Sequence, residues 1–370
     1  MIQIDKFPAE NKVCLDGNST IVSITSSNGL GFYFRAKIYI NDELFDEQSW
    51  SRKNDKTAEK DLKKLYHAYF ETIFNNNFNS GLEQQLHLIK KLSITINEYS
   101  AVDDELIQTQ DLPILYLMYN NKPVEFDDSL KIQFLAFNPE SVRVPLNGKI
   151  SIPFMVRPNN EALFVEIKDS NNTILDVKAK ASFSENRVYQ YNFDLEKANL
   201  PTSTLYISLS ITVGNTSIVK YIKIFQSENY PIKEVAFLNN FGFWCYVYLD
   251  GQLSIEDNFE TKTYEEKDGS ESVYEIVEKQ TYTINTGSLL ASEKNIINQI
   301  CQALQAKIYF NSQYFKLINA TKKITSYRDR DNLYSENLTF SVKNNISVEN
   351  AIYVSEDYDS NDYEVNDYNA

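Results

Sequence analysis

Residues 232–252 read IKEVAFLNNFGFWCYVYLDGQ and form the densest aromatic run in the chain. Six aromatic rings fall between Phe237 and Tyr248, and one belongs to Trp244, one of only two tryptophans. Side chains alternate between the two faces of a strand, so Phe243 points one way while Trp244, Tyr246 and Tyr248 point the other. Both faces are large and apolar, which predicts a strand that is covered twice. We interpret Phe243, Trp244, Tyr246 and Tyr248 as core or as a subunit interface. The alternative is an exposed platform that stacks on sugar rings or anchors a partner.

The sequence changes character on both sides of this run, which predicts a modular protein. A chain of 370 residues is long enough for two or three domains. Tyr and Phe favour strands, and the chain has 25 Tyr and 22 Phe, so we predict a mainly β protein with a few helices. The predicted units are β-rich or sandwich-like domains at residues 1–140, 141–227 and 228–354, and a disordered acidic tail at 355–370.

In the first domain, apolar residues recur at helical spacing and predict an amphipathic helix over residues 58–76. The stripe consists of Leu62, Leu65, Tyr66, Tyr69, Phe70, Ile73 and Phe74. A weaker helical pattern covers Leu82, Leu86 and Ile89. Asn28-Gly29 separates two strand-like runs, 19–26 and 30–40, and predicts a hairpin between them. Asn41-Asp42 predicts a second turn, and strands follow at 92–98, 112–119 and 130–137.

The segment 141–227 shows regular short strands separated by turn residues. Leu205, Ile207, Leu209, Ile211 and Val213 alternate with polar residues. The predicted strands are 149–156, 161–168, 172–180, 187–194, 203–213 and 217–225. This number of strands in under 90 residues is typical of a sandwich of immunoglobulin or fibronectin type III.

The third domain should contain the aromatic strand, a long hairpin and a helix. Asp250-Gly251 predicts a turn between two paired strands. Residues 252–266 and 271–284 predict a protruding hairpin with one solvated face and its tip at Asp268-Gly269. A helix is predicted over 291–305 with Ser292 as a possible cap, followed by strands at 306–310, 314–318, 322–327 and 336–343.

The net charge and the cysteines limit the kinds of partner and the cellular compartment that we expect for this protein. A formal net charge of -15 repels nucleic acid and anionic lipid, so we expect neither a nucleic-acid partner nor membrane insertion. No stretch resembles a signal peptide or a membrane helix. Cys14, Cys245 and Cys301 have no spacing of a zinc site or a redox pair, which fits free thiols in a reducing cytoplasm.

The sequence offers little for catalysis. His67 and His87 have no nucleophile motif near them, and no phosphate-binding loop or metal motif occurs. Acidic pairs such as Asp127-Asp128 could act in glycoside hydrolysis or hold calcium, but such pairs are expected by chance in a chain with 51 acidic residues. We predict no catalytic, cofactor-binding or metal residues and no enzyme activity.

The phrase FLNNFGFWCYVYLDG at residues 237–251 resembles a segment of tail-tip or baseplate (distal-tail-like) structural proteins of tailed phages and prophages of Bacteroidetes-type bacteria. Further matching phrases are LLAS at 289–292, YRDRDNL at 327–333 and LTF at 338–340. The opening FYFRAKIYINDELF at 32–45 is also similar to theirs. The 293–305 stretch departs from the family as an insertion.

The resemblance implies a non-enzymatic virion protein, made in the cytoplasm of the bacterial host. It would form a homo-oligomeric ring, such as a hexamer, that connects the tail tube to fibre, hub or other host-recognition parts. Two alternatives remain open from the residues themselves: a carbohydrate-binding or adhesin module that contacts the host surface, and a glycosidase that uses an acid pair.

Overall fold

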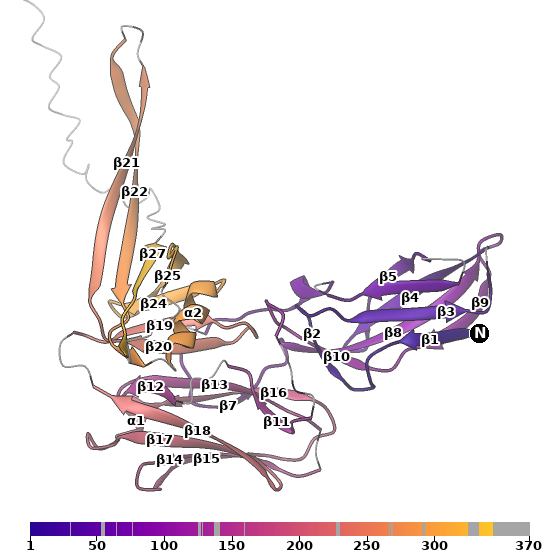
Figure 1. Ribbon diagram of the computed structural model, residues 1–370, viewed down its shortest axis with the longest axis horizontal. Helices are drawn as coiled ribbons and strands as arrows, with labels where there is room; N and C mark the ends of the chain where they lie inside the picture. Colours follow the sequence, from indigo (N-terminus) through magenta and orange to yellow (C-terminus); the bar gives the residue numbers. More distant parts are fainter. Residues whose placement is uncertain are drawn as a thin grey trace, which may run out of the picture.

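Short strands dominate the computed structural model, which arranges them in three consecutive β units (Figure 1). The structure describes residues 1–342 except 30, 53–55, 64, 76, 125–126, 128, 137–140, 159, 227–229, 266, 268, 291–292 and 325–332. The predicted tail at 355–370 therefore lies outside the described residues. The chain is mainly β with tandem sandwich-like units, as the sequence predicts.

The N-terminal unit packs a three-stranded sheet against a six-stranded one. The first sheet has the order β1 (Ile2–Lys6), β3 (Ile21–Ser26) and β6 (Thr57–Asp61). The second has the order β2 (Val13–Leu15), β10 (Leu115–Met118), β8 (Ile89–Ser100), β4 (Phe32–Ile40) and β5 (Glu43–Trp50), with β9 (Leu106–Asp111) also paired to β8. The turn at Asn41-Asp42 is confirmed: both residues have positive φ, as a tight hairpin requires, and β4 pairs with β5 across them.

Two sequence-based expectations in this unit are wrong. Asn28-Gly29 does not close a hairpin, because β3 pairs with β1 and β6 while β4 belongs to the other sheet. The helix over 58–76 does not form either: β6 covers Thr57–Asp61, and only a short 3-10 turn, η1, follows at His67–Tyr69. Leu62, Tyr66 and Phe70 are nevertheless buried. Pairing with β3 takes residues 57–61 out of the predicted helix, and the stripe that begins at Leu62 reaches the core from turns and irregular backbone.

The central unit has the immunoglobulin arrangement of two facing sheets. One sheet has the order β12 (Ser141–Pro145), β18 (Thr216–Phe225), β17 (Tyr206–Val213), β14 (Leu163–Asp169) and β15 (Ile174–Lys180). The other has the order β11 (Ile132–Phe134), β13 (Lys149–Val156), β16 (Arg187–Asp194) and β7 (Gly81–Gln84). β12 runs parallel to β18, and every other pairing is antiparallel. A short helix, α1 (Leu195–Ala198), follows β16.

Strand β7 reaches this sandwich from far away in the sequence. It lies between η1 and β8 in the chain but pairs with β16, from Gly81↔Asn192 to Gln84↔Tyr189. The weak helical pattern at Leu82, Leu86 and Ile89 is therefore wrong, because Leu82 lies in β7 and Ile89 begins β8. The sandwich is thus completed by strands from outside residues 141–227.

The C-terminal unit is a seven-stranded sheet with one helix. Its order is β20 (Trp244–Leu249), β19 (Lys233–Leu238), β24 (Ala306–Phe310), β25 (Gln313–Asn319), β27 (Asn337–Val342), β22 (Glu271–Asn285) and β21 (Leu253–Glu265). A short pair joins β23 (Leu289–Leu290) to β26 (Leu333–Tyr334), and helix α2 spans Lys294–Gln302.

The predicted hairpin and helix are both present in this unit, but Asp250-Gly251 does not turn between paired strands. β20 and β21 lie at opposite ends of the sheet order, because β20 pairs with β19 and β21 pairs with β22. Residues 322–324 of the predicted strand 322–327 are not a strand, and the rest of it lies outside the described residues, as does Ser292.

Candidate functional site

Strand β20 lies where the three β units meet. Phe243, Trp244 and Tyr248 are buried, with exposed fractions of 1%, 5% and 3%, and Tyr246 is half-buried. Phe243 belongs to a core shared by the N-terminal and C-terminal units, whereas Tyr248 belongs to the core of the sandwich. The four interface candidates therefore form an interface within one chain, where they offer little surface to another copy.

Trp244 is enclosed by side chains from distant segments. The Phe74 ring packs edge-on at 4.6 Å between centroids, and the Lys307 ammonium lies 5.6 Å from the Trp244 ring. Phe74 comes from the stripe that the sequence assigned to a helix. That stripe therefore supplies a cover for the aromatic strand, which explains why its apolar side chains are needed although no helix forms there.

The loop between β19 and β20 joins all three units through Asn239. Its amide oxygen accepts hydrogen bonds from the backbone N–H groups of Phe241 (2.9 Å) and Phe243 (3.0 Å). Its amide nitrogen donates to the carbonyl of Leu135, just after sandwich strand β11, at 2.9 Å. Gly242 has a φ of +83°, and a Cβ there would meet Leu88 and Tyr119 of the N-terminal unit. This geometry accounts for Asn239 and Gly242 in the aromatic phrase.

A second contact between units surrounds the ammonium of Lys149, at the start of β13. Lys149 donates to Glu234 Oε1 at 3.1 Å and to the Tyr314 hydroxyl at 3.0 Å. Its ammonium also lies 5.1–5.9 Å from the ring centroids of four aromatic residues, so cation–π attraction adds to the ion pair. These rings belong to Tyr309, Tyr314, Tyr246 and Phe78.

The hydroxyls around Glu234 are held as neutral donors. Burial and the nearby Glu234 carboxylate both raise the pKa of Tyr314 and of Tyr248. The Tyr314 hydroxyl donates to Glu234, and the Tyr248 hydroxyl donates to Glu234 Oε2 at 3.3 Å while it accepts from the backbone N–H of Lys149 at 2.5 Å. A part-buried charge pair with satisfied partners helps to fix the orientation of neighbouring elements, so this cluster holds the sandwich against the C-terminal unit.

Reactive groups are dispersed across the described part of the chain. His67 Nδ1 lies 2.5 Å from Asp16 Oδ2 and stacks on Tyr119 with centroids 5.0 Å apart, which makes it a satisfied structural histidine. Burial raises the pKa of the Cys245 thiol to about 12, which keeps it unreactive. Among the described residues, no three His, Cys, Asp or Glu side chains gather as metal ligands. Within that same part, no helix is long and apolar enough to cross a membrane.

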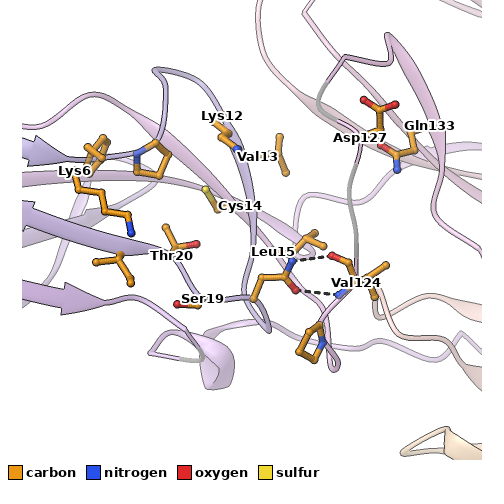
Figure 2. Close-up of a pocket in the computed structure, with 15 residues that line it drawn as sticks. Lys6, Lys12, Val13, Cys14, Leu15, Ser19, Thr20, Val124, Asp127 and Gln133 are labelled. Atoms are coloured by element: carbon orange, nitrogen blue, oxygen red, sulfur yellow. Dashed lines mark hydrogen bonds between the residues drawn. The ribbon is translucent and has the colours of Figure 1, made fainter.

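A cavity of about 1020 Å³ opens between the N-terminal unit and the segment that leaves it (Figure 2). Its wall combines apolar residues of β2 with Lys6 and Lys12, and Asp127 lies on the connecting segment. Asn18 closes one side by donating to the Val124 carbonyl at 2.8 Å and accepting from the Val124 N–H at 3.1 Å. Among the described residues that line it, the wall has cationic and apolar groups and one carboxylate, that of Asp127.

The long hairpin formed by β21 and β22 is the most exposed element of the chain, and we call it the arm. β27 pairs with β22 only from Gln280 to Asn285, so beyond Gln280 the described arm has two strands. Eight residue pairs then extend outward, which is about 26 Å at strand spacing. Figure 1 shows the arm projecting away from the rest of the molecule.

The arm has an apolar face that continues the core. At its base, Leu253 pairs with Ile284, which is fully buried, and Ile255 pairs with Tyr282. On the same face further out, Phe259 is 67% exposed and Ile276 is 63% exposed. The opposite face is polar, with Glu256, Asn258 and other hydrophilic side chains. The expectation of one solvated face is wrong for the outer arm, because within the described chain neither face is covered there.

No family model matches this chain, and no curated protein matches it. Solved structures that align with it include the ICAM-5 D1-D4 ectodomain fragment, at 11% identity over 75% of each chain, with a TM-score of 0.22. A chain from the complex of Dpr2 Ig1-Ig2 with DIP-Theta Ig1-Ig3 aligns at 8% identity over 61% of this chain and 99% of that one, with a TM-score of 0.19. The β-glucuronidase of Parabacteroides merdae aligns at 6% identity over 60% of this chain and 25% of its own, with a TM-score of 0.18.

Proposed function

We propose that this chain is a non-enzymatic structural protein of a phage tail tip or baseplate. In this role it is a repeating subunit of a ring that connects the tail tube to host-recognition parts. The observation that carries the proposal is the arm, a two-stranded ribbon whose apolar face continues the core and then extends into solvent. The sequence resemblance to tail-tip proteins supplies the identity of the assembly.

The arm needs a neighbour for physical reasons. A two-stranded hairpin is marginally stable in water unless its apolar face is covered. Fully burying a side chain such as Phe259 or Ile276 contributes about 1.5–3 kcal/mol, and the outer arm has no such contribution within the described chain. Large exposed apolar surfaces on a folded protein mark interaction sites. The arm is therefore suited to assembly.

The junction supports the same role. The Asn239 loop and the Lys149 cluster connect the three units with buried hydrogen bonds and an ion pair. Such contacts hold the arm at a defined angle to the sandwich, and symmetric assembly requires a repeated geometry of this kind.

The proposal is tested with the full chain and with purified phage or prophage particles. Size-exclusion chromatography with light scattering should show a closed oligomer, electron microscopy should show rings, and particle proteomics should detect the chain. Absence of the chain from particles would refute the proposal, whatever its oligomeric state in solution.

A carbohydrate-binding role remains the second candidate because of a small cavity beside Trp244. The cavity has a volume of about 190 Å³, and amide side chains such as Gln85, Gln190 and Asn192 line it together with Tyr246. The Trp244 indole N–H is buried and has no hydrogen-bond acceptor among the described residues. A glycan array should then give signals that Trp244→Phe abolishes while unfolding stays unchanged. A blank array would retire this candidate.

A further inference from the structure

We infer that the arm of one copy lies on the outer face of the five-stranded sandwich sheet of a second copy. This inference rests on the proposed function, because it names the surface that covers the arm in the assembly. We define the sandwich face as the outward side of β14, β17 and β18. It is the face of that sheet that does not pack against β13 and β16.

The sandwich face carries exposed aromatic rings and an exposed valine. Phe164, Tyr206 and Tyr221 are 48%, 41% and 55% exposed, and Val219 is 47% exposed. Small polar residues fill the centre, because Ser208 pairs with Tyr221 and Ser210 pairs with Val219 across the strands. The face therefore has room for another ribbon and has apolar groups to contact it.

Charge favours the arm as the occupant. Two carboxylates, Asp257 and Glu278, share the apolar face of the arm with Phe259. The sandwich face presents the exposed Lys223 as the cation that can meet these carboxylates, whereas Lys168 is paired with Glu166 of the same face at 2.5 Å. Opposite charges on two apolar surfaces guide their register and oppose pairing of like surfaces.

The charged residues of the whole arm and of the sandwich strands are also complementary. The two arm strands contain only two lysines, Lys262 and Lys279, against seven acids: Glu256, Asp257, Glu260, Glu265, Glu271, Glu275 and Glu278. Strands β14, β15, β17 and β18 contain more lysines than acids. The long-range field therefore steers an arm towards a sandwich.

The position of the two surfaces makes the contact intermolecular. In Figure 1 the arm projects from one end of the molecule, while β14, β15 and β17 lie at the opposite end, with the C-terminal sheet between them. A chain cannot fold its own arm onto its own sandwich face from there. The contact is therefore head-to-tail, and repeated head-to-tail contacts generate a ring when the rotation closes and a filament when it does not.

Charge reversal in the full chain tests the inference. Glu278→Lys places like charges opposite each other, and so does Lys223→Glu, so each variant should weaken self-association about tenfold or more. Mixing the two variants, or combining both changes in one chain, should restore association because opposite charges then meet. Glu256→Lys, on the polar face of the arm, is the matched control and should associate as the wild type does.

The apolar contact is tested with a neighbouring pair. Phe259→Ser should reduce association, and Asn258→Ser, one residue away on the other face, should not. Association is measured by analytical ultracentrifugation, and circular dichroism checks the fold of each variant.

The outcomes separate the inference from the proposed function. An oligomer that survives all these changes would overturn the inference while leaving the tail role intact. A monomeric wild type that is present in particles would also overturn it, and would indicate a different tail protein on the arm. Association that depends on the arm in a protein absent from particles would support the inference and remove the proposed function.

Discussion

Replacing Asn239 by alanine should loosen the junction of the three units more than any other single amide deletion. Asn239 is only 5% exposed. Its amide oxygen accepts from the N–H groups of Phe241 and Phe243, and its amide nitrogen donates to the Leu135 carbonyl. Alanine removes these three hydrogen bonds and a fourth, from the amide nitrogen to Cys245 Sγ at 3.5 Å, and leaves both N–H groups and the carbonyl in the interior without this partner.

The expected loss follows from the cost of unsatisfied groups. A buried donor or acceptor that loses its partner costs about 1–3 kcal/mol. Three such groups would cost more in a simple sum, but a water molecule entering the space of the amide offsets part of it. We therefore expect the free energy of unfolding to fall by about 3–5 kcal/mol.

The assay is urea unfolding followed by tryptophan fluorescence in a Trp50→Phe background, which leaves Trp244 as the reporter at the junction. Asn240→Ala is the matched control. Asn240 contributes its backbone carbonyl, which accepts from the Asn121 N–H at 2.8 Å and is retained in alanine. If Asn239→Ala costs under about 1 kcal/mol, or no more than Asn240→Ala, the role assigned to this side chain is refuted.

Three further predictions concern the junction and the sandwich core. Gly242→Ala should lower the melting temperature measured by differential scanning calorimetry. The φ of +83° is strained for alanine, and the alanine Cβ would lie 2.7 Å from a Leu88 methyl carbon. An unchanged melting temperature would contradict the close approach. Lys149→Met should lower the free energy of unfolding by about 3–5 kcal/mol, because Glu234 is left without its cation. Adding Glu234→Gln should recover part of this loss in a double-mutant cycle. Strictly additive losses would argue against the ion pair. Burial lowers the pKa of Lys220 from 10.5 to about 8 in the folded chain. The unfolded chain therefore binds more protons between these values, so this residue should add about 3 kcal/mol to the free energy of unfolding as pH rises from 8 to 10.5. Lys220→Met should lack that rise in urea titrations at several pH values, and a parallel pH profile in both proteins would disprove the assignment.

Local patterns predicted the sandwich well because its strands carry their own signals. β13 and β16 have the predicted bounds, and Ile207, Leu209 and Ile211 alternate inward as expected. Period-2 alternation with polar turns specifies a half-buried strand without reference to distant residues. The sequence also predicted the aromatic strand β20, because a strand with rings on both faces must be covered on both sides.

The failures share one physical cause, which is pairing with partners far along the chain. The predicted helix over 58–76 begins in a segment, residues 57–61, that instead pairs with β3. Residues 81–84 carry no strand signal of their own and become a strand only against β16. At Asn28-Gly29 and Asp250-Gly251 the turn residues are suited to hairpins, yet the strands they connect belong to different sheets or to opposite ends of one sheet. A turn signal specifies a local bend and not the identity of the strand that pairs next.

The outer arm has an apolar face that the described part of its own chain does not cover. Its alternation of Ile255 and Phe259 with polar residues predicts a strand with one covered face, and that prediction held only at the base. Alternation of apolar and polar residues indicates that one face of a strand is buried. That face can be buried against another copy as well as within the chain. An apolar face that the fold leaves bare is therefore evidence about assembly. The same reasoning excludes Trp244 and Tyr248 as assembly contacts, because this chain already covers them.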